Sequence, residues 1–304
     1  MRELFVYCDG GFGNRFNALV SGLLIGKRTG RQVVVVWPVN NWCGAAFSDL
    51  FDLDQQVVER ELSTFSSERG RFDYLMVEDR LGLSSAFVDP GKLGAWDELE
   101  RFDAQSTRPV FYYTALVPAF ISEEEIVQQV RQLRLQSSLA QTATRFLAEH
   151  NLGRSVGDFI GVQIRKTDFG AHGADDAALH GIVQRTGSQR FFVCSDDADV
   201  EQRFSALPNV AIHRKCAHVE KLIEGGWNAV TVDRSGRHYP FNVNRGRASV
   251  EAAVVDLLIL SRSRIVLTSS STFLRTALRV QAADLLGLHA RREPMRNEML
   301  APCP

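Results

Sequence analysis

The sequence has few cysteines and no long apolar run, and both absences exclude whole classes of protein. Its five cysteines are scattered and form no CxxC pair, so neither a disulfide framework nor a thiolate zinc site is expected. Charge interrupts every apolar run well before the ~20 residues that a membrane-spanning helix needs. Met1-Arg2-Glu3 leads directly into strand-like sequence, without the apolar segment of a secretory signal. We therefore expect a cytoplasmic protein with no membrane span.

A surplus of positive charge is also missing. The formal net charge is −1 over 304 residues, and nucleic-acid-binding proteins usually carry a basic surface, so no nucleic-acid partner is expected. The chain is longer than a typical domain with a single hydrophobic core, and its length favours two domains of roughly 150 residues each.

Several familiar enzyme motifs are absent as well. The sequence contains no HExxH, no GxSxG and no GxxxxGK[ST]. The opening stretch GGFGNRF has the form of a dinucleotide-binding turn, but Phe16 stands where that motif needs its third glycine. The next strand ends at Trp37-Pro38, without the acidic residue that would bind a ribose. NAD is therefore not expected, although a glycine turn before a helix still offers free N–H groups to a phosphate.

What is present is a repeated alternation of strand-like and helical segments in both halves. Such β-α-β order implies parallel sheets covered by helices, one in each half. Strands are expected near 4–7, 31–36, 109–116, 158–165, 190–197, 209–215, 264–270 and 283–290, and helices near 16–29, 121–135, 139–149, 200–206, 249–263 and 272–281. Residues 59–110 and 217–248 show no clear pattern, and the second of these stretches is a candidate lid.

Two adjacent cations, Arg165 and Lys166, follow the expected strand at 158–165. They would lie at the carboxyl end of a parallel strand, where open α/β sheets bind ligands. Arginine can hold a phosphate with two parallel hydrogen bonds, and lysine adds a point charge. An ordinary strand end with an ion pair to Asp168 fits the same pattern, so the residues alone leave both interpretations open.

Asp256 lies in a helical segment, 249–263, that is apolar on nearly every side. Such a helix is buried, and an ionised carboxylate within it is costly without partners. The edge of a guanine base offers two N–H donors that would suit this carboxylate. A salt bridge to a nearby arginine such as Arg247 would suit it equally.

Hydroxyl groups and aspartates mark two further strand ends. The run from Thr268 to Thr272 stands between a strand and a helix, where hydroxyls and free N–H groups can bind an anion, although Ser and Thr are also common N-caps. Asp196 and Asp197 likewise end a strand and open a helix. This position favours helix capping over a metal site, with Asp196 as a candidate contact to the nucleotide.

These segments, in this order, resemble the GDP-fucose-dependent fucosyltransferases, in particular the α-1,6 enzymes that modify chitooligosaccharides or N-glycan cores. GGFGNRFNAL resembles the family's N-terminal Gly-x-Gly-Asn turn. IGVQIRKTD is similar to its His-x-Arg-Arg-Thr-Asp motif, with Gln163 in place of the histidine and Lys166 in place of the second arginine. FFVCSDD resembles its ATDD strand end, and the segment from VEAAVVDLLIL to STFLRTAL resembles its third motif.

The resemblance implies an α/β protein of the GT-B class, with two Rossmann-like domains facing a cleft. Residues 1–152 would form the acceptor side, and residues 153–304 would bind the GDP-sugar. It implies an enzyme that transfers fucose from GDP-fucose to a hydroxyl of a glycan-type acceptor, with no metal or other cofactor. Arg165 would stabilise charge on the diphosphate, and Asp175 or Asp176 would deprotonate the acceptor.

The same resemblance assigns the other site residues. The diphosphate would be bound by Gly13, Asn14, Arg165, Lys166, Ser270, Ser271 and Thr272. Guanine and ribose would be bound by Gln163, Asp196 and Asp256. Two alternatives remain open: a transferase that uses another nucleotide sugar, and a GDP-sugar-binding protein without catalysis.

Overall fold

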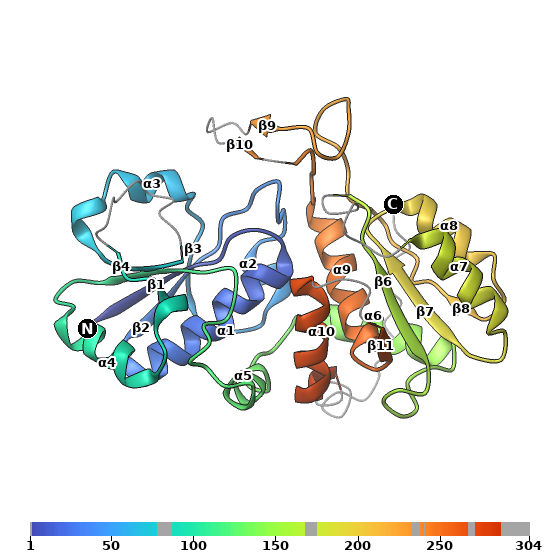
Figure 1. Cartoon of the computed structure of the whole chain (residues 1–304), viewed down its shortest axis with the longest axis horizontal. Coiled ribbons are helices and arrows are strands. Elements are labelled where there is room, and N and C mark those ends of the chain that lie inside the picture. Colours follow the sequence, from blue (N-terminus) through green and yellow to red (C-terminus); the bar gives the residue numbers. More distant parts are fainter. Residues whose placement is uncertain are drawn as a thin grey trace.

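The structure is a computed structural model that describes residues 2–77, 87–167, 175–232, 238–239, 241–266 and 271–286. In these ranges the chain forms two parallel sheets with helices packed around them (Figure 1). The sequence predicted one such sheet in each half, and this is confirmed. Among the described residues, no helix combines the length and apolar character needed to cross a membrane.

The first sheet has the strand order β3-β2-β1-β5-β4, and all of its pairings are parallel. Leu4 and Val6 of β1 pack in one core, and Phe5 and Tyr7 pack in another on the opposite face. Both faces of this strand are therefore buried, as its continuous apolar sequence predicts. The elements of this half are β1 (Glu3–Tyr7), α1 (Phe12–Thr29), β2 (Gln32–Val36), α2 (Phe47–Leu50), β3 (Gln56–Val58), α3 (Leu62–Ser66), β4 (Asp73–Met76), α4 (Trp96–Gln105), β5 (Val110–Tyr113) and α5 (Glu123–Val130).

The second sheet has the strand order β11-β6-β7-β8 and is also parallel throughout. A short antiparallel pair of strands, β9 with β10, lies outside both sheets. Within 284–286, the structure shows no strand where one was expected at 283–290. The elements of this half are α6 (Ser137–Glu149), β6 (Ile160–Ile164), α7 (Asp176–Arg185), β7 (Phe191–Ser195), α8 (Ala198–Ser205), β8 (Val210–Ala211), β9 (Thr231–Val232), β10 (His238–Tyr239), α9 (Arg247–Leu260), β11 (Arg264–Val266) and α10 (Thr272–Ala283).

Helices α9 and α10 lie between the two sheets (Figure 1). Helix α10 follows a strand of the second sheet but packs against α1 and α5 of the first half. Helix α6 precedes residue 152, yet its Phe146 meets Phe192 of β7 with ring centroids 5.5 Å apart. One apolar core therefore runs through both halves, and a domain boundary at residue 152 stays a prediction.

Polar contacts between described residues also join the halves, and two examples show how. Arg279 of α10 donates to Asn17 Oδ1 of α1 at 2.7 Å and to Glu123 Oε1 of α5 at 2.6 Å. In the second example, the Gly44 N–H donates to the Arg245 carbonyl at 2.7 Å. The position of α10 against α1 is thus held by hydrogen bonds as well as by apolar packing.

Two cysteines are buried as the sequence predicted. Cys8 and Cys194 are buried free thiols, as expected for small groups in or beside apolar strands. Burial raises the pKa of the Cys8 thiol to about 12, so this thiol is unreactive at neutral pH.

Candidate functional site

The carboxyl edge of the second sheet gathers most of the predicted site residues. Because its strands are parallel, the residues that follow them lie along one edge. Arg165 and Lys166 follow β6, Asp196 follows β7, and the N-terminus of α10 lies beyond β11. Gln163 is within β6 and is buried.

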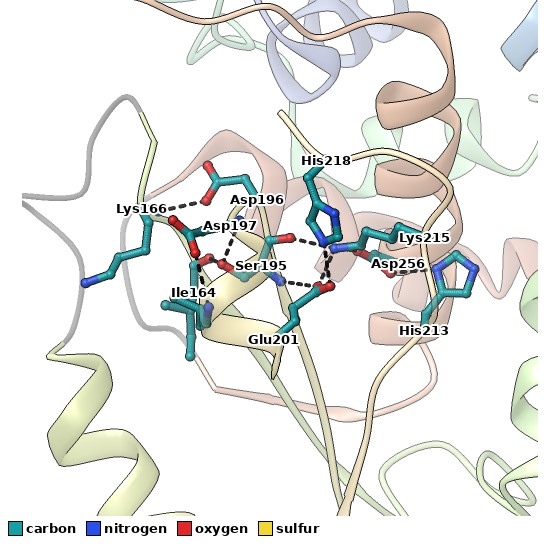
Figure 2. Close-up of polar contacts among 11 residues, drawn as sticks. Ile164, Lys166, Ser195, Asp196, Asp197, Glu201, His213, Lys215, His218 and Asp256 are labelled. Carbon is teal, nitrogen blue, oxygen red and sulfur yellow. Dashed lines mark hydrogen bonds and ion pairs between the residues drawn. The ribbon is translucent and has the colours of Figure 1, made fainter. Parts of the chain in front are cut away.

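Asp196 holds the loop that carries the two cations. Ile164 of β6 is in register with Ser195 of β7, so the residues that follow them are neighbours. One Asp196 oxygen accepts from the Lys166 backbone N–H at 2.8 Å (Figure 2). The other accepts from the Thr167 hydroxyl at 2.6 Å. These contacts give Asp196 a role in positioning the loop, and its contact with a nucleotide stays a prediction.

Asp197 caps helix α8, as the sequence favoured. Its carboxylate accepts from the Val200 N–H at 3.1 Å. Within the described ranges, no group of three or more His, Cys, Asp or Glu side chains is arranged to hold a metal ion.

The two candidate bases, Asp175 and Asp176, are engaged at the start of α7. Asp175 is the N-cap and accepts from the Ala177 N–H at 2.9 Å. Asp176 accepts from Lys166 Nζ at 2.6 Å and is ion-paired with Arg203. The hydrogen bond from Lys166, aided by Arg203, lowers the pKa of Asp176. A carboxylate with a lowered pKa is a poor proton acceptor, so these contacts favour structural roles over the predicted catalytic one.

Asp256 belongs to a buried cluster of charged side chains (Figure 2). Its Oδ1 lies 3.0 Å from His213 Nδ1, and its Oδ2 lies 2.8 Å from Lys215 Nζ. Arg247, the partner that a purely structural interpretation suggested, pairs instead with Asp49 at 3.0 Å. The carboxylate is therefore balanced by residues that follow β8, and the alternative of a salt bridge to Arg247 is not the one that forms.

Lys215 connects this cluster to strand β7. Its Nζ donates to the Ser195 carbonyl at 2.5 Å and is ion-paired with Glu201 of α8. Glu201 also accepts from the Ser195 N–H at 2.8 Å and lies 2.8 Å from His218 Nε2. Burial lowers the pKa of Lys215, but the charges of Asp256 and Glu201 outweigh this and raise it. Lys215 is thus a permanent cation between two carboxylates.

The sequence-based predictions missed four members of this cluster: Glu201, His213, Lys215 and His218. They lie in or just after short elements where charged residues usually face solvent. The available signal was Asp256 itself, because a carboxylate on an apolar helix needs a cation from elsewhere in the chain.

The N-terminal glycine turn meets the N-terminus of α10. A Cβ atom placed on Gly13 would lie 2.8 Å from the Phe273 backbone nitrogen and 3.0 Å from Thr272 Oγ1. Only a residue without a side chain permits this approach. Neither α1 nor α10 has an acidic residue in its first turn. The N-termini of α1 and α10 therefore lie close together. Neither first turn has a carboxylate that would neutralise the partial positive charge of its helix N-terminus.

Three further predicted diphosphate-binding residues, Asn14, Ser271 and Thr272, lie at these two helix ends. Asn14 lies in the first turn of α1, and Thr272 is the first residue of α10. Ser271 caps α10, since its hydroxyl accepts from the Leu274 N–H at 3.2 Å. Ser270 lies outside the described residues.

Arg15, which the sequence-based predictions did not single out, ties the glycine turn to the loop after β2. Its fully buried guanidinium donates to the carbonyls of Gly10 and Pro38, both at 2.7 Å, and to Asn40 Oδ1 at 3.0 Å. It also lies 5.0 Å from the centre of the Trp37 ring. These contacts fix the conformation of the turn that approaches α10.

Known structures share this arrangement of sheets and helices. A crystal structure of NodZ α-1,6-fucosyltransferase soaked with GDP-fucose matches with a TM-score of 0.52 and 19% sequence identity, over 94% of this chain and 92% of that one. Fucosyltransferase NodZ from Bradyrhizobium matches with a TM-score of 0.52 and 20% identity, over 94% of both chains. The chain has the NodZ fold. No family model and no curated protein sequence matches it.

The likeness to NodZ confirms the α/β, GT-B fold class that the motifs implied. NodZ is itself a fucosyltransferase, and it has been crystallised with GDP as well as soaked with GDP-fucose. At 19–20% identity this likeness establishes the fold, so the activity of this chain has to be argued from its own residues.

Proposed function

We propose that the protein is a glycosyltransferase that transfers fucose from GDP-fucose to a hydroxyl of a glycan-type acceptor, without a metal ion. One observation carries the proposal. In a chain with the NodZ fold, Arg165 follows β6, Asp256 is linked through Lys215 to the end of β7, and α10 begins beyond β11. Residues 153–304 would bind the donor, and residues 1–152 would bind the acceptor and contribute the Gly13 turn.

The proposed reaction is a displacement at the anomeric carbon of fucose. The acceptor oxygen forms a bond to this carbon as the bond to the β-phosphate oxygen breaks. GDP leaves with the bonding electron pair, and the acceptor hydroxyl loses its proton. Negative charge grows on the leaving diphosphate, where the Arg165 guanidinium and the N–H groups of two helix N-termini can stabilise it.

Guanine recognition is the first testable consequence. A carboxylate oxygen has two acceptor sites, so Asp256 can bind His213 and Lys215 and still accept from guanine N1–H and N2–H. GDP should raise the melting temperature clearly more than ADP or UDP at equal concentration, since a ligand at about 100 times its Kd stabilises by about 2.7 kcal/mol. Asp256→Asn should shrink this difference.

The matched control for Asp256→Asn is Asp199→Asn, because Asp199 is an exposed carboxylate on α8. It should keep the preference for GDP. Equal stabilisation of the wild-type protein by all three nucleotides would contradict the proposed guanine site.

Metal independence is the second consequence. The proposed diphosphate site has a guanidinium and two helix N-termini as its sources of positive charge, and Asp197 is engaged as a helix cap. Addition of EDTA should therefore leave the GDP affinity, measured by calorimetry, and the turnover of GDP-fucose nearly unchanged. A large loss that manganese or magnesium restores would show that the donor needs a metal ion.

A further inference from the structure

Lys215 makes three contacts, and each ends on a different element. Its ammonium group donates to Asp256 Oδ2 on α9 at 2.8 Å, to the Ser195 carbonyl at the end of β7 at 2.5 Å, and to Glu201 on α8. An ammonium group has three N–H donors, so these contacts use all of them. The side chain is only 5% exposed, which leaves no alternative partner in solvent.

These contacts continue to the loop after β6. Ser195, whose carbonyl Lys215 binds, directly precedes Asp196 in the chain. The Asp196 carboxylate in turn accepts from the Lys166 backbone N–H at 2.8 Å. Figure 2 shows the resulting path from Asp256, through Lys215 and the end of β7, to Lys166. The proposed base-binding carboxylate and the proposed phosphate-binding loop are therefore linked through hydrogen bonds to two consecutive residues, Ser195 and Asp196, at the end of β7.

The charge of the cluster explains why a lysine is needed at this point. Asp256 and Glu201 both have buried side chains, 4% and 7% exposed. Two buried carboxylates without a shared cation would repel each other and lose hydration, so each would turn towards whatever donor it could reach. Lys215 prevents this and fixes Asp256 Oδ2 in one direction. The free acceptor sites of Asp256 then have a defined orientation.

We propose that Lys215 is a positioning residue that orients Asp256 for guanine and links base recognition to the loop that carries Arg165. The inference rests on the proposed function, because it assumes that Asp256 binds guanine. It adds a residue that no motif of the sequence indicated. Lys215 itself need not touch the donor.

The test compares the affinities of GDP and IDP, because the inosine base lacks only the 2-amino group that Asp256 would bind. The wild type should bind GDP about tenfold to a hundredfold more tightly than IDP, the ratio expected for one hydrogen bond to a charged group. Lys215→Met alone leaves two buried carboxylates unbalanced and is expected to destabilise the fold. The informative variant is therefore Lys215→Met combined with Glu201→Gln, which removes one charge of each sign.

The double variant should fold, as judged by its melting temperature, and its preference for GDP should fall to roughly threefold or less. Glu201→Gln alone is the matched control, because it retains Lys215 beside Asp256, and it should keep the wild-type preference. A folded double variant with the wild-type preference would overturn the inference and leave the proposed function intact. A wild-type protein that does not distinguish the two nucleotides would instead contradict the guanine site itself.

Discussion

Arg165→Ala should lower the turnover of GDP-fucose at saturating donor by about 10²–10³, or about 3–4 kcal/mol, the usual effect of losing a donor that acts on the transition state. The physical reason is that charge on the β-phosphate grows as the glycosidic bond breaks. A guanidinium held at the end of β6 therefore stabilises the transition state more than the bound donor. Steady-state kinetics should show the loss in kcat, beyond any weakening of GDP binding.

Three further variants show whether the effect belongs to the guanidinium. Arg165→Lys should recover little activity, because lysine keeps the charge but lacks the planar pair of donors. Lys166→Ala should cost less, since the Lys166 ammonium is already paired with Asp176. Arg264→Ala removes an exposed arginine at the start of the neighbouring strand β11 and should be neutral. A folded Arg165→Ala protein with near-normal turnover would make Arg165 a structural strand-end residue.

The position of Arg165 was predictable, whereas the partners of Asp256 were not. Two cations that directly follow a parallel strand lie at the carboxyl end of the sheet, whatever the position of that strand in the strand order. For Asp256 the sequence could only indicate that a cation was needed. Arg247 is close in the chain, but residues 247 and 256 on one helix are separated by roughly 13 Å at 1.5 Å per residue. Lys215 reaches Asp256 because the order of the second sheet brings the end of β8 beside α9.

The first half also contains elements that could not be predicted from the sequence. The apolar strands β1, β2 and β5 were expected. β4 and α4 fall in the stretch from 59 to 110, where no clear pattern was found, and β3 lies just before it and was not predicted. β3 has only three residues, and its partner β2 supplies the pairing that holds it. β4 did carry a signal, a short apolar run whose Tyr74 and Met76 pack in one core and whose Leu75 packs in the other. Charged and glycine residues on both sides obscured it.

The roles of the aspartates depended on neighbours that the sequence does not reveal. Asp197 was predictable as a cap because capping involves only the next few residues. Asp196 binds the loop after β6 because the register of β6 and β7 places it there. Asp176 is paired with Lys166 and Arg203 from other elements. Local contacts could be predicted, and contacts between elements required the fold.

Gly13→Ala should separate α1 from α10 and weaken both the fold and GDP binding. The added methyl group would lie 2.8 Å from the Phe273 nitrogen and 2.9 Å from the Thr272 carbonyl carbon, which are backbone atoms and cannot rotate away. Alanine is favoured over glycine within a helix by about 1 kcal/mol, but overpacking of this kind costs about 1–3 kcal/mol. The clash should therefore outweigh the gain, and urea unfolding should show a less stable protein.

The matched control lies in the same turn. A Cβ atom on Gly11 would meet no atom within 4 Å, and its φ is −71°. Gly11→Ala should therefore cause no clash and cost only the roughly 1 kcal/mol by which an N-cap position favours glycine over alanine. GDP affinity of Gly13→Ala, measured by calorimetry, should fall about tenfold, because the two helix N-termini would no longer converge on one phosphate. If Gly13→Ala is as stable as Gly11→Ala and binds GDP as the wild type does, α1 and α10 do not meet at this glycine in solution. The first half would then contribute no anion-binding groups through this turn.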